Sequence, residues 1–351
     1  MIYFFVYNLG SYGGAAQQAL KVAKETGDNV VICNRGSHYY GEFPDNIRIL
    51  NLNGFIVFRI FQLLKIFSLN RRHIYHFHGF FFIPIFFAFL FRVPFIIKTT
   101  LMGDDDYISL GNGFFGFLKQ FLFKRCTYNV VLSRKAKEVN GAYIPLHKIH
   151  LIPNGVYICD KKREKKGNQF YFCGVICKRK NALKSIKVFH LYYSDLPDSK
   201  LYIVGPDSKY GPSMDFDMDY VNECKKYVDE NDLKEKVVFT GLISGTEVNE
   251  ISSQCKAILF FSDFEGMPNA VIEAMANNCV PIISSMHGVG EELVSGGAGF
   301  VCEENFPSID EIDRMIYNEI PFNKAIKNYS FAITLGKLKE LYNSIKNGVV
   351  A

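Results

Sequence analysis

Two carboxylates and a helix start lie close together in the stretch from Ala257 to Val294. An apolar strand, Ala257 to Phe261, leads into a loop that carries Glu265, and a helix opened by Pro268 carries Glu273. Proline suits the first position of a helix because its missing N–H would be unpaired there. The neighbouring amides and the positive end of the helix dipole favour an anion. Because like charges repel, the Glu265 carboxylate suits hydroxyl groups attached to such an anion, as on a sugar phosphate.

A glycine turn joins the apolar first strand to the helix that ends at Gly27, and it contains Gly13 and Gly14. Strand, glycine turn and helix in this order bring backbone N–H groups toward a phosphate. The full G-x-G-x-x-G pattern is absent, so a simple tight turn explains the same residues equally well. His76 and His78 point to the same side of a later strand, either as satisfied sheet-edge groups or as part of a site.

Three adjacent aspartates, Asp104 to Asp106, follow another predicted strand. A pair of carboxylates at a strand end suits Mg²⁺ or Mn²⁺ that bridges a diphosphate. A solvated loop that caps the next segment explains the same residues without a metal.

Length and composition indicate a globular protein of two domains. The chain has 351 residues, more than one typical core of about 150 holds. Hydrophobic residues make up 48% and charged residues 21%, which excludes a disordered chain. The nine cysteines show no paired spacing beyond Cys173 and Cys177, so we expect free thiols rather than a metal site. The first residues lack a basic region and a cleavage site, and we expect the protein to stay in the cytoplasm.

The positive charge is concentrated in the first half of the chain. The net charge of +5 is too small to indicate nucleic acid as a partner. Residues 55–73 and 114–137 contain Lys and Arg but no acid, and they are rich in Phe, Leu and Ile. This pattern favours peripheral contact with an anionic membrane, although helices packed in a core would have similar compositions. Residues 80–91 are apolar but fall short of the roughly twenty needed to cross a bilayer, so they form either a core helix or an interfacial element.

Short apolar strands alternate with helices along the chain, which indicates parallel sheets covered on both faces. The basic run from Lys161 to Lys166 indicates a linker. We therefore expect an α/β protein with two Rossmann-like domains, residues 1–160 and 161–330. Their carboxyl-end loops would face a central cleft, where ligands of this fold class bind. The tail, about 331–351, has the pattern of an amphipathic helix.

The sequence EGMPNAVIEAMANNCVPIIS, which begins at Glu265, resembles the E-x7-E element of retaining glycosyltransferases with the GT-B fold, in glycosyltransferase family 4. The resemblance implies that Glu265 contacts the donor sugar and that Glu273 contacts the nucleotide ribose. It also implies that the loop between them binds the donor. The residues of that loop are Gly266, Met267, Pro268 and Asn269.

The sequence CGVICKRKN resembles the family pattern G-R-x4-K-G, in which Arg and Lys neutralise the donor diphosphate. Lys180 keeps the lysine position, whereas Val175 replaces the arginine and Asn181 replaces the glycine. Lys178 or Arg179 would supply the missing charge from the same loop. A diphosphate leaving group needs such partners because charge stabilisation lowers the cost of its departure.

The first domain matches the family in three further places. Gly13 and Gly14 correspond to a Gly-Gly pair that approaches the donor phosphate and the acceptor. The family pattern T-x-H-G-x-D corresponds to the segment from Thr100 to Asp105, with Met102 in place of the histidine. Asp105 keeps its position and is expected to face the acceptor. The C-terminal helix of the family crosses back to brace the N-terminal domain.

The resemblance implies a metal-independent retaining glycosyltransferase with Glu265, Lys180 and Asp105 as catalytic groups. It implies no cofactor, and a UDP- or GDP-linked sugar would be the donor co-substrate. The expected acceptor is a saccharide or lipid-linked saccharide in bacterial O-antigen, capsule or lipopolysaccharide synthesis at the inner face of the membrane. One alternative is a GT-B sugar-nucleotide 2-epimerase, which needs no acceptor. Another is a non-catalytic sugar-nucleotide-binding protein, which the Met102 and Val175 departures favour.

Overall fold

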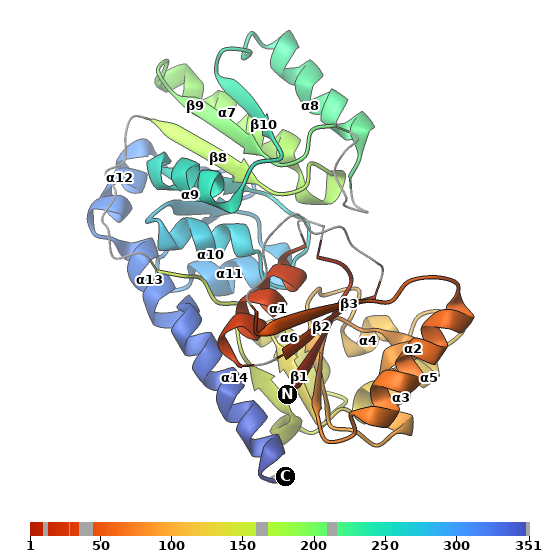
Figure 1. The fold of residues 1–351 in the computed structure, drawn as a ribbon. Helices are drawn as coiled ribbons and strands as arrows, with labels where there is room; N and C mark the ends of the chain where they lie inside the picture. Colours follow the sequence, from red (N-terminus) through yellow and green to blue (C-terminus); the bar gives the residue numbers. More distant parts are fainter. Residues whose placement is uncertain (10–12, 28, 35–44, 159–167, 209–215, 349–351) are drawn as a thin grey trace. The chain divides into compact units, whose positions relative to one another are not determined.

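The computed structural model describes residues 1–9, 13–27, 29–34, 45–158, 168–208 and 216–348. The chain forms two compact units, one of Met1–Gly155 with Ala332–Ala351 and one of Val156–Phe331 (Figure 1). The division therefore lies at Gly155, a little before the predicted boundary at residue 160. The predicted linker, Lys161 to Lys166, lies outside the described residues.

The first unit contains a parallel sheet in which the described strands follow the order β3-β2-β1-β4-β5-β6-β7. Its strands are β1 (Ile2–Val6), β2 (Asn29–Cys33), β3 (Ile47–Asn51), β4 (Ile74–His78), β5 (Phe95–Thr99), β6 (Tyr128–Val131) and β7 (Ile149–Leu151). Its helices are α1 (Gly14–Glu25), α2 (Ile56–Leu69), α3 (Phe82–Leu90), α4 (Tyr107–Leu110), α5 (Gly116–Lys124), α6 (Arg134–Gly141) and α14 (Phe331–Lys346).

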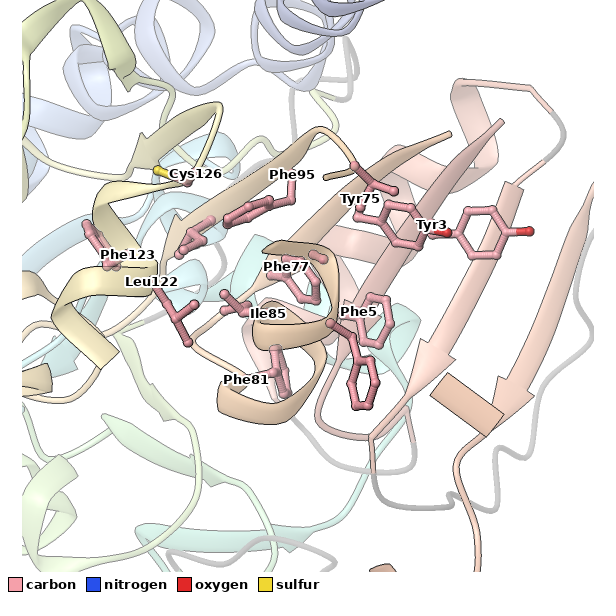
Figure 2. Packing of buried hydrophobic residues seen from close by; sticks show 14 of the residues in the cluster. Tyr3, Phe5, Tyr75, Phe77, Phe81, Ile85, Phe95, Leu122, Phe123 and Cys126 are labelled. Atoms are coloured by element: carbon pink, nitrogen blue, oxygen red, sulfur yellow. The ribbon is translucent and has the colours of Figure 1, made fainter. Parts of the chain in front are cut away.

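Alternation along the central strands sends side chains into two different layers. Tyr3, Phe5, Tyr75 and Phe77 belong to an aromatic core, which also takes in side chains of α2, α3 and α5 (Figure 2). The rings of Phe5 and Phe77 lie 4.7 Å apart between centroids. The apolar stretch 80–91 therefore contributes to the core through α3. No helix among the described residues is long and apolar enough to cross a membrane.

The opposite face of this sheet carries polar side chains, and α14 covers part of it. The Tyr342 hydroxyl lies 2.7 Å from Nδ1 of His76, and the ring of Phe4 meets Tyr342 edge-on at 6.5 Å. Thr334, near the start of α14, donates a hydrogen bond to the carbonyl of Pro153 at 3.1 Å. These contacts build the C-terminal helix into the first unit.

The second unit contains a parallel sheet in which the described strands follow the order β10-β9-β8-β11-β12-β13. Its strands are β8 (Gln169–Cys173), β9 (Lys200–Val204), β10 (Val237–Gly241), β11 (Ala257–Phe260), β12 (Val280–Ile283) and β13 (Phe300–Val301). Its α-helices are α7 (Ala182–Asp195), α8 (Met218–Glu230), α9 (Gly245–Gln254), α10 (Asn269–Ala276), α11 (Val289–Val294), α12 (Ile309–Tyr317) and α13 (Ile320–Tyr329). A short 3-10 turn, Lys178–Lys180, precedes α7.

Both sheets reverse their strand order next to their first strand. In the first unit the reversal lies between β1 and β4, and in the second unit between β8 and β11. Ligands of open α/β sheets bind outside the carboxyl ends of the strands at such a switch point. The topology therefore gives each unit one preferred binding position, and in the second unit that position lies between the loops after β8 and β11.

Candidate functional site

The loops after β8 and β11 are tied together at the switch point of the second unit. The backbone N–H of Asp263 donates to the carbonyl of Arg179 at 2.8 Å, and Nη1 of Arg179 donates to the carbonyl of Phe264 at 3.1 Å. The guanidinium of Arg179 also lies over the Phe264 ring, 5.3 Å from its centroid. The two segments that the sequence singles out, the basic run and the glutamate loop, are therefore neighbours in space.

Glu265 is the centre of this arrangement. Its Oε1 accepts hydrogen bonds from Oγ of Ser262 at 2.9 Å and from Nη1 of Arg179 at 3.0 Å, and Nζ of Lys180 lies 3.5 Å away. The Glu265 side chain is 11% exposed, so these partners compensate a charge that is largely withdrawn from water. One carboxylate oxygen thus holds two cations and a hydroxyl in place.

Ser262 was not predicted as a site residue. It is fully buried at the end of β11, and its own carbonyl accepts a hydrogen bond from the Ser284 hydroxyl at the end of β12. A serine three positions before the glutamate in a strand-end loop was the only sequence signal. That spacing becomes informative only once the loop conformation turns both side chains toward each other.

Gly174 leaves the space in which Lys180 lies. A Cβ at Gly174 would stand 3.0 Å from Cδ and 3.2 Å from Nζ of Lys180. Gly205, after β9, is under tighter constraint, because a Cβ there would stand only 1.9 Å from the carbonyl oxygen of Gly174. Glycines at two strand ends therefore allow the backbone and the lysine to approach each other.

The helix that follows the glutamate loop begins one residue later than predicted. Its first residue is Asn269, and Pro268 is the capping residue, with φ −72° and ψ 109°. The reason is that the Pro268 backbone is extended while its carbonyl already accepts the first helical hydrogen bonds, from Val271 and Ile272. Pro268 has no N–H and adds no donor. Within the described part of the chain, the amides of Gly266 and Met267 have no hydrogen-bond partner.

Glu273 and Lys180 both act on the thiol of Cys173 at the end of β8. Burial, with a smaller contribution from the Glu273 charge, raises the pKa of Cys173 to about 12, while the Lys180 charge opposes the rise. The thiol therefore stays protonated and unreactive at neutral pH. Glu273 itself is half-buried on α10. Lys178 differs from its two neighbours because it is exposed, and no described contact links it to Glu265.

The switch point of the first unit is lined by the start of α1 and the end of β4. Gly13 caps α1 with φ −66°, and Gly14 is its first residue. His78, at the end of β4, is buried next to Ala15, and burial lowers the pKa of its imidazole well below the usual value. The pKa of His76 is lowered in the same way, so both rings are neutral at neutral pH.

Lys98 lies on the same face of the first sheet as His76 and His78. It contacts the Pro-Asn-Gly turn at the end of the first unit. Its Nζ donates to Oδ1 of Asn154 at 2.8 Å, and burial lowers the pKa of Lys98 to about 7. Gln18 of α1 holds the next residue of the turn, with its amide bonded to both the carbonyl and the N–H of Gly155, at 2.9 and 3.2 Å. The turn is therefore fixed from two sides.

Asp105 was expected to face an acceptor, but its carboxylate is buried and occupied by its own loop. It accepts hydrogen bonds from the N–H and hydroxyl of Thr100, at 2.8 and 2.7 Å, and from the N–H of Leu101 at 2.9 Å. Burial nevertheless raises the pKa of Asp105 to about 7. The neighbouring Asp106 caps α4 by accepting from the N–H groups of Ile108 and Ser109. These two aspartates organise the loop.

No group of three or more metal-ligating side chains occurs in the described ranges.

Comparison with known proteins shows which family this site resembles. Residues 158–330 match the family model described as Glycosyl transferases group 1. The matched residues, which make up nearly all of the second unit, belong to this family. A curated relative, the O-antigen chain mannosyltransferase RfbU of Salmonella typhimurium strain LT2, is 29% identical over 229 residues. That match covers 62% of this chain and spans 60% of the relative's length.

Solved structures of similar proteins confirm the predicted GT-B fold. Anabaena Alr3699/HepE, solved with UDP and glucose, has a TM-score of 0.72 at 15% identity and covers 98% of this chain and 100% of its own. Sucrose-phosphate synthase from Thermosynechococcus elongatus has a TM-score of 0.76 at 13% identity, covering 99% of both chains. The lipopolysaccharide outer core galactosyltransferase WaaB has a TM-score of 0.62 at 16% identity, covering 98% of this chain and 99% of its own.

The structure shows how the chain accommodates each departure from the family pattern. Asn181, in place of glycine, has the left-handed conformation with φ 51° and ψ 48°, which asparagine tolerates better than other non-glycine residues. Val175, in place of arginine, is buried and brings no charge, whereas Arg179 reaches Glu265. Met102, in place of histidine, packs against the aromatic core of the first unit.

Proposed function

We propose that this chain transfers a sugar from a nucleotide-diphosphate sugar to an acceptor hydroxyl, with retention of configuration. The convergence of Arg179 and Lys180 on one oxygen of Glu265 carries the proposal. At the switch point of the second unit, this cluster combines a carboxylate suited to sugar hydroxyls with cations suited to a diphosphate.

The charge balance of this cluster favours binding of an anion. Arg179 and Lys180 contribute two positive charges, and Glu265 neutralises one of them. The two cations, together with the amides of Gly266 and Met267 and the start of α10, would stabilise the diphosphate as it departs. Lys178 and Asn269 belong to the same two loops and would contact the donor at its edge.

Each remaining group has a defined part in the proposed reaction. Glu265 would accept hydrogen bonds from the donor sugar, and Glu273 would do so from the ribose. The bond between the anomeric carbon and the diphosphate oxygen breaks, and the acceptor oxygen bonds on the same face. The acceptor proton passes to the departing diphosphate, so positioning and charge stabilisation supply the catalysis. Gly13 and Gly14 would approach the donor phosphate and the acceptor, while Asp105 would serve the fold of its own loop rather than the reacting groups.

We infer a lipid-linked saccharide of bacterial surface polysaccharide as the acceptor. The names of two similar proteins, an O-antigen chain mannosyltransferase and a lipopolysaccharide outer core galactosyltransferase, support this class. The neighbours solved with UDP or UDP-glucose favour a UDP-linked donor, and a GDP-linked donor remains the alternative to test. The basic, apolar helices of the first unit suit peripheral contact with the inner face of a membrane, from the cytoplasmic side.

A thermal-shift screen against UDP- and GDP-linked sugars tests the donor class. A ligand at 100 times its dissociation constant stabilises the folded state by about 2.7 kcal/mol, and we expect one nucleotide sugar to do so. Lys180→Ala should remove most of that shift. Product analysis then separates the functions, because a transferase needs the acceptor, an epimerase converts the donor alone, and a binding protein leaves it unchanged. Absence of a shift with every donor would contradict the proposal.

A further inference from the structure

An apolar groove lies in the first unit between α2 and the start of α3. Its volume is about 240 Å³, and Ile56, Ile60 and Leu63 of α2 line one side while Phe81, Phe82 and Pro84 line the other. Pockets that enclose whole small molecules have volumes of about 300–1,000 Å³. This groove is smaller, and its dimensions suit part of a longer, flexible molecule.

Two polar residues belong to the lining of the groove. Arg59 and Asn34 both line it, and Asn34 follows directly after β2, at the carboxyl-end edge of the sheet. Nη2 of Arg59 donates to the carbonyl and to Oδ1 of Asn34, at 2.7 and 2.8 Å. A guanidinium has five N–H donors, and in the described part of the chain these contacts use only one of its nitrogens. Arg59 therefore retains donors and a positive charge for an anion.

Helix α2, which lines one side of the groove, also carries exposed apolar residues. The solvent-facing side of α2 carries Val57, Phe58, Phe61 and Leu69, each more than half exposed. Phe114 and Phe117, next to and within α5, are 98% and 86% exposed. Helices α2, α3 and α5 are neighbours in the first unit (Figure 1). Exposed apolar surface of this kind marks a binding face on a protein in water.

We propose that this groove binds the hydrocarbon chain of a lipid-phosphate-linked acceptor and that Arg59 faces the phosphate. The inference rests on the proposed function and specifies its acceptor. An apolar groove with a cation in its lining matches a molecule with a hydrocarbon chain and an anionic head. A volume of about 240 Å³ accommodates part of one chain, which favours an isoprenoid phosphate over a two-chain phospholipid. The exposed aromatic surface would receive the rest of the chain together with the membrane.

Fluorescence titration of the full chain with farnesyl phosphate tests this site. The sequence contains no tryptophan, so Phe82→Trp places a single reporter in the groove. We expect a saturable emission change with farnesyl phosphate, weaker binding of farnesol, and no change with inorganic phosphate alone.

A matched pair of substitutions in the reporter background identifies the phosphate contact. Arg59→Gln and Lys65→Gln each remove one positive charge from α2, but only Arg59 lines the groove. We expect Arg59→Gln to weaken farnesyl phosphate binding at least tenfold, with farnesol binding unchanged, and Lys65→Gln to have little effect. Equal losses in both variants, or a reporter that responds only to phospholipid vesicles, would overturn the proposal.

The donor site supplies an independent readout. If Arg59→Gln leaves farnesyl phosphate binding intact while the nucleotide-sugar thermal shift persists, the groove assignment is wrong and the proposed function stands. If farnesyl phosphate binds as expected but no nucleotide sugar binds, the groove assignment stands and the proposed function is wrong.

Discussion

At the scale of single residues, contacts within the second unit fix the Glu265 side chain. Ser262, Arg179 and Lys180 all contact the same carboxylate oxygen. Hydrogen bonds to charged groups contribute about 1.5–3 kcal/mol each, and removal of one partner from a buried ion pair leaves an uncompensated charge. The carboxylate is therefore held in one position, which is the condition for a group that orients a sugar.

Asp105→Asn is expected to reduce stability far more than chemistry. The asparagine side chain has one acceptor oxygen in place of two, so either the N–H of Leu101 or the hydroxyl of Thr100 loses its acceptor, at a cost of about 1–3 kcal/mol in unfolding free energy. Urea denaturation measures this loss. At a temperature where the variant remains folded, its rate of transfer should be close to that of the wild type. A large loss of rate with unchanged stability would show that Asp105 acts on the substrate.

The same substitution should change the pH dependence of stability. The Asp105 pKa is raised from 3.8 to about 7, so between these pH values the folded protein binds a proton that the unfolded chain has released. Stability from this group is thus present below pH 3.8 and is lost as the pH rises toward 7. The Asp105→Asn variant should lack that decline in a series of thermal melts. An identical pH profile in both proteins would contradict the assigned burial effect.

At the scale of elements, strand ends and helix starts bring the site residues together. The loop after β8 makes a 3-10 turn and enters α7 through Asn181, whose side chain caps that helix by accepting from the N–H of Lys184 at 3.3 Å. The loop after β11 enters α10 through the extended Pro268. Arg179 and Lys180 can reach Glu265 only because both helix starts are fixed.

Two substitutions at Asn181 separate backbone conformation from side-chain capping. Asn181→Gly retains the left-handed conformation without strain and should change the unfolding free energy by only a few tenths of a kcal/mol. Asn181→Ala places a Cβ in that conformation and removes the cap, which should cost about 2 kcal/mol. Chemical denaturation of both variants measures the difference. Equal stability of the two variants would show that the conformation at residue 181 is not a constraint.

The sequence was sufficient to predict the fold and the neighbourhood of Glu265. Apolar strands alternating with helices predict parallel sheets, and the glutamate loop and the basic run both follow such strands. The sequence could not predict that the Asp105 carboxylate accepts hydrogen bonds from its own loop, because these bonds depend on the backbone conformation at Thr100 and Leu101. Ser262, Lys98 and Gln18 act through contacts with residues that are distant in sequence or brought close by a loop. Such contacts are set by tertiary packing.

At the scale of the whole molecule, charge and apolar surface are unevenly distributed between the two units. The first unit carries the exposed aromatic residues of α2 and of the segment before α5, and residues 55–73 contain no acid. Cations in the same unit lie over aromatic rings, with Arg71 5.3 Å from the Phe91 centroid and Arg125 4.8 Å from that of Phe121. Cations and exposed aromatic residues in the same unit suit the headgroup region of an anionic membrane.

Co-sedimentation with anionic vesicles should therefore depend on the first unit. Each basic residue near such a surface contributes about 1 kcal/mol, so the double variant Arg71→Gln, Arg72→Gln should weaken binding by about thirtyfold. The matched control is Lys226→Gln, Lys234→Gln in the second unit, where both lysines are well exposed. Binding should also fall as salt rises. If the wild type does not sediment with the vesicles at moderate salt, the proposed membrane contact is wrong.

The initial rate of sugar transfer by Glu265→Gln, relative to the wild type, tests whether the Glu265 cluster is the donor site. The amide keeps the size of the side chain but lacks the negative charge that Arg179, Lys180 and the sugar hydroxyls share. With folding verified by circular dichroism and thermal melting, we expect the rate to fall by at least about a hundredfold, the loss typical for one preorganised electrostatic group. A folded Glu265→Gln protein with near-normal turnover would contradict the assignment of this cluster as the donor site.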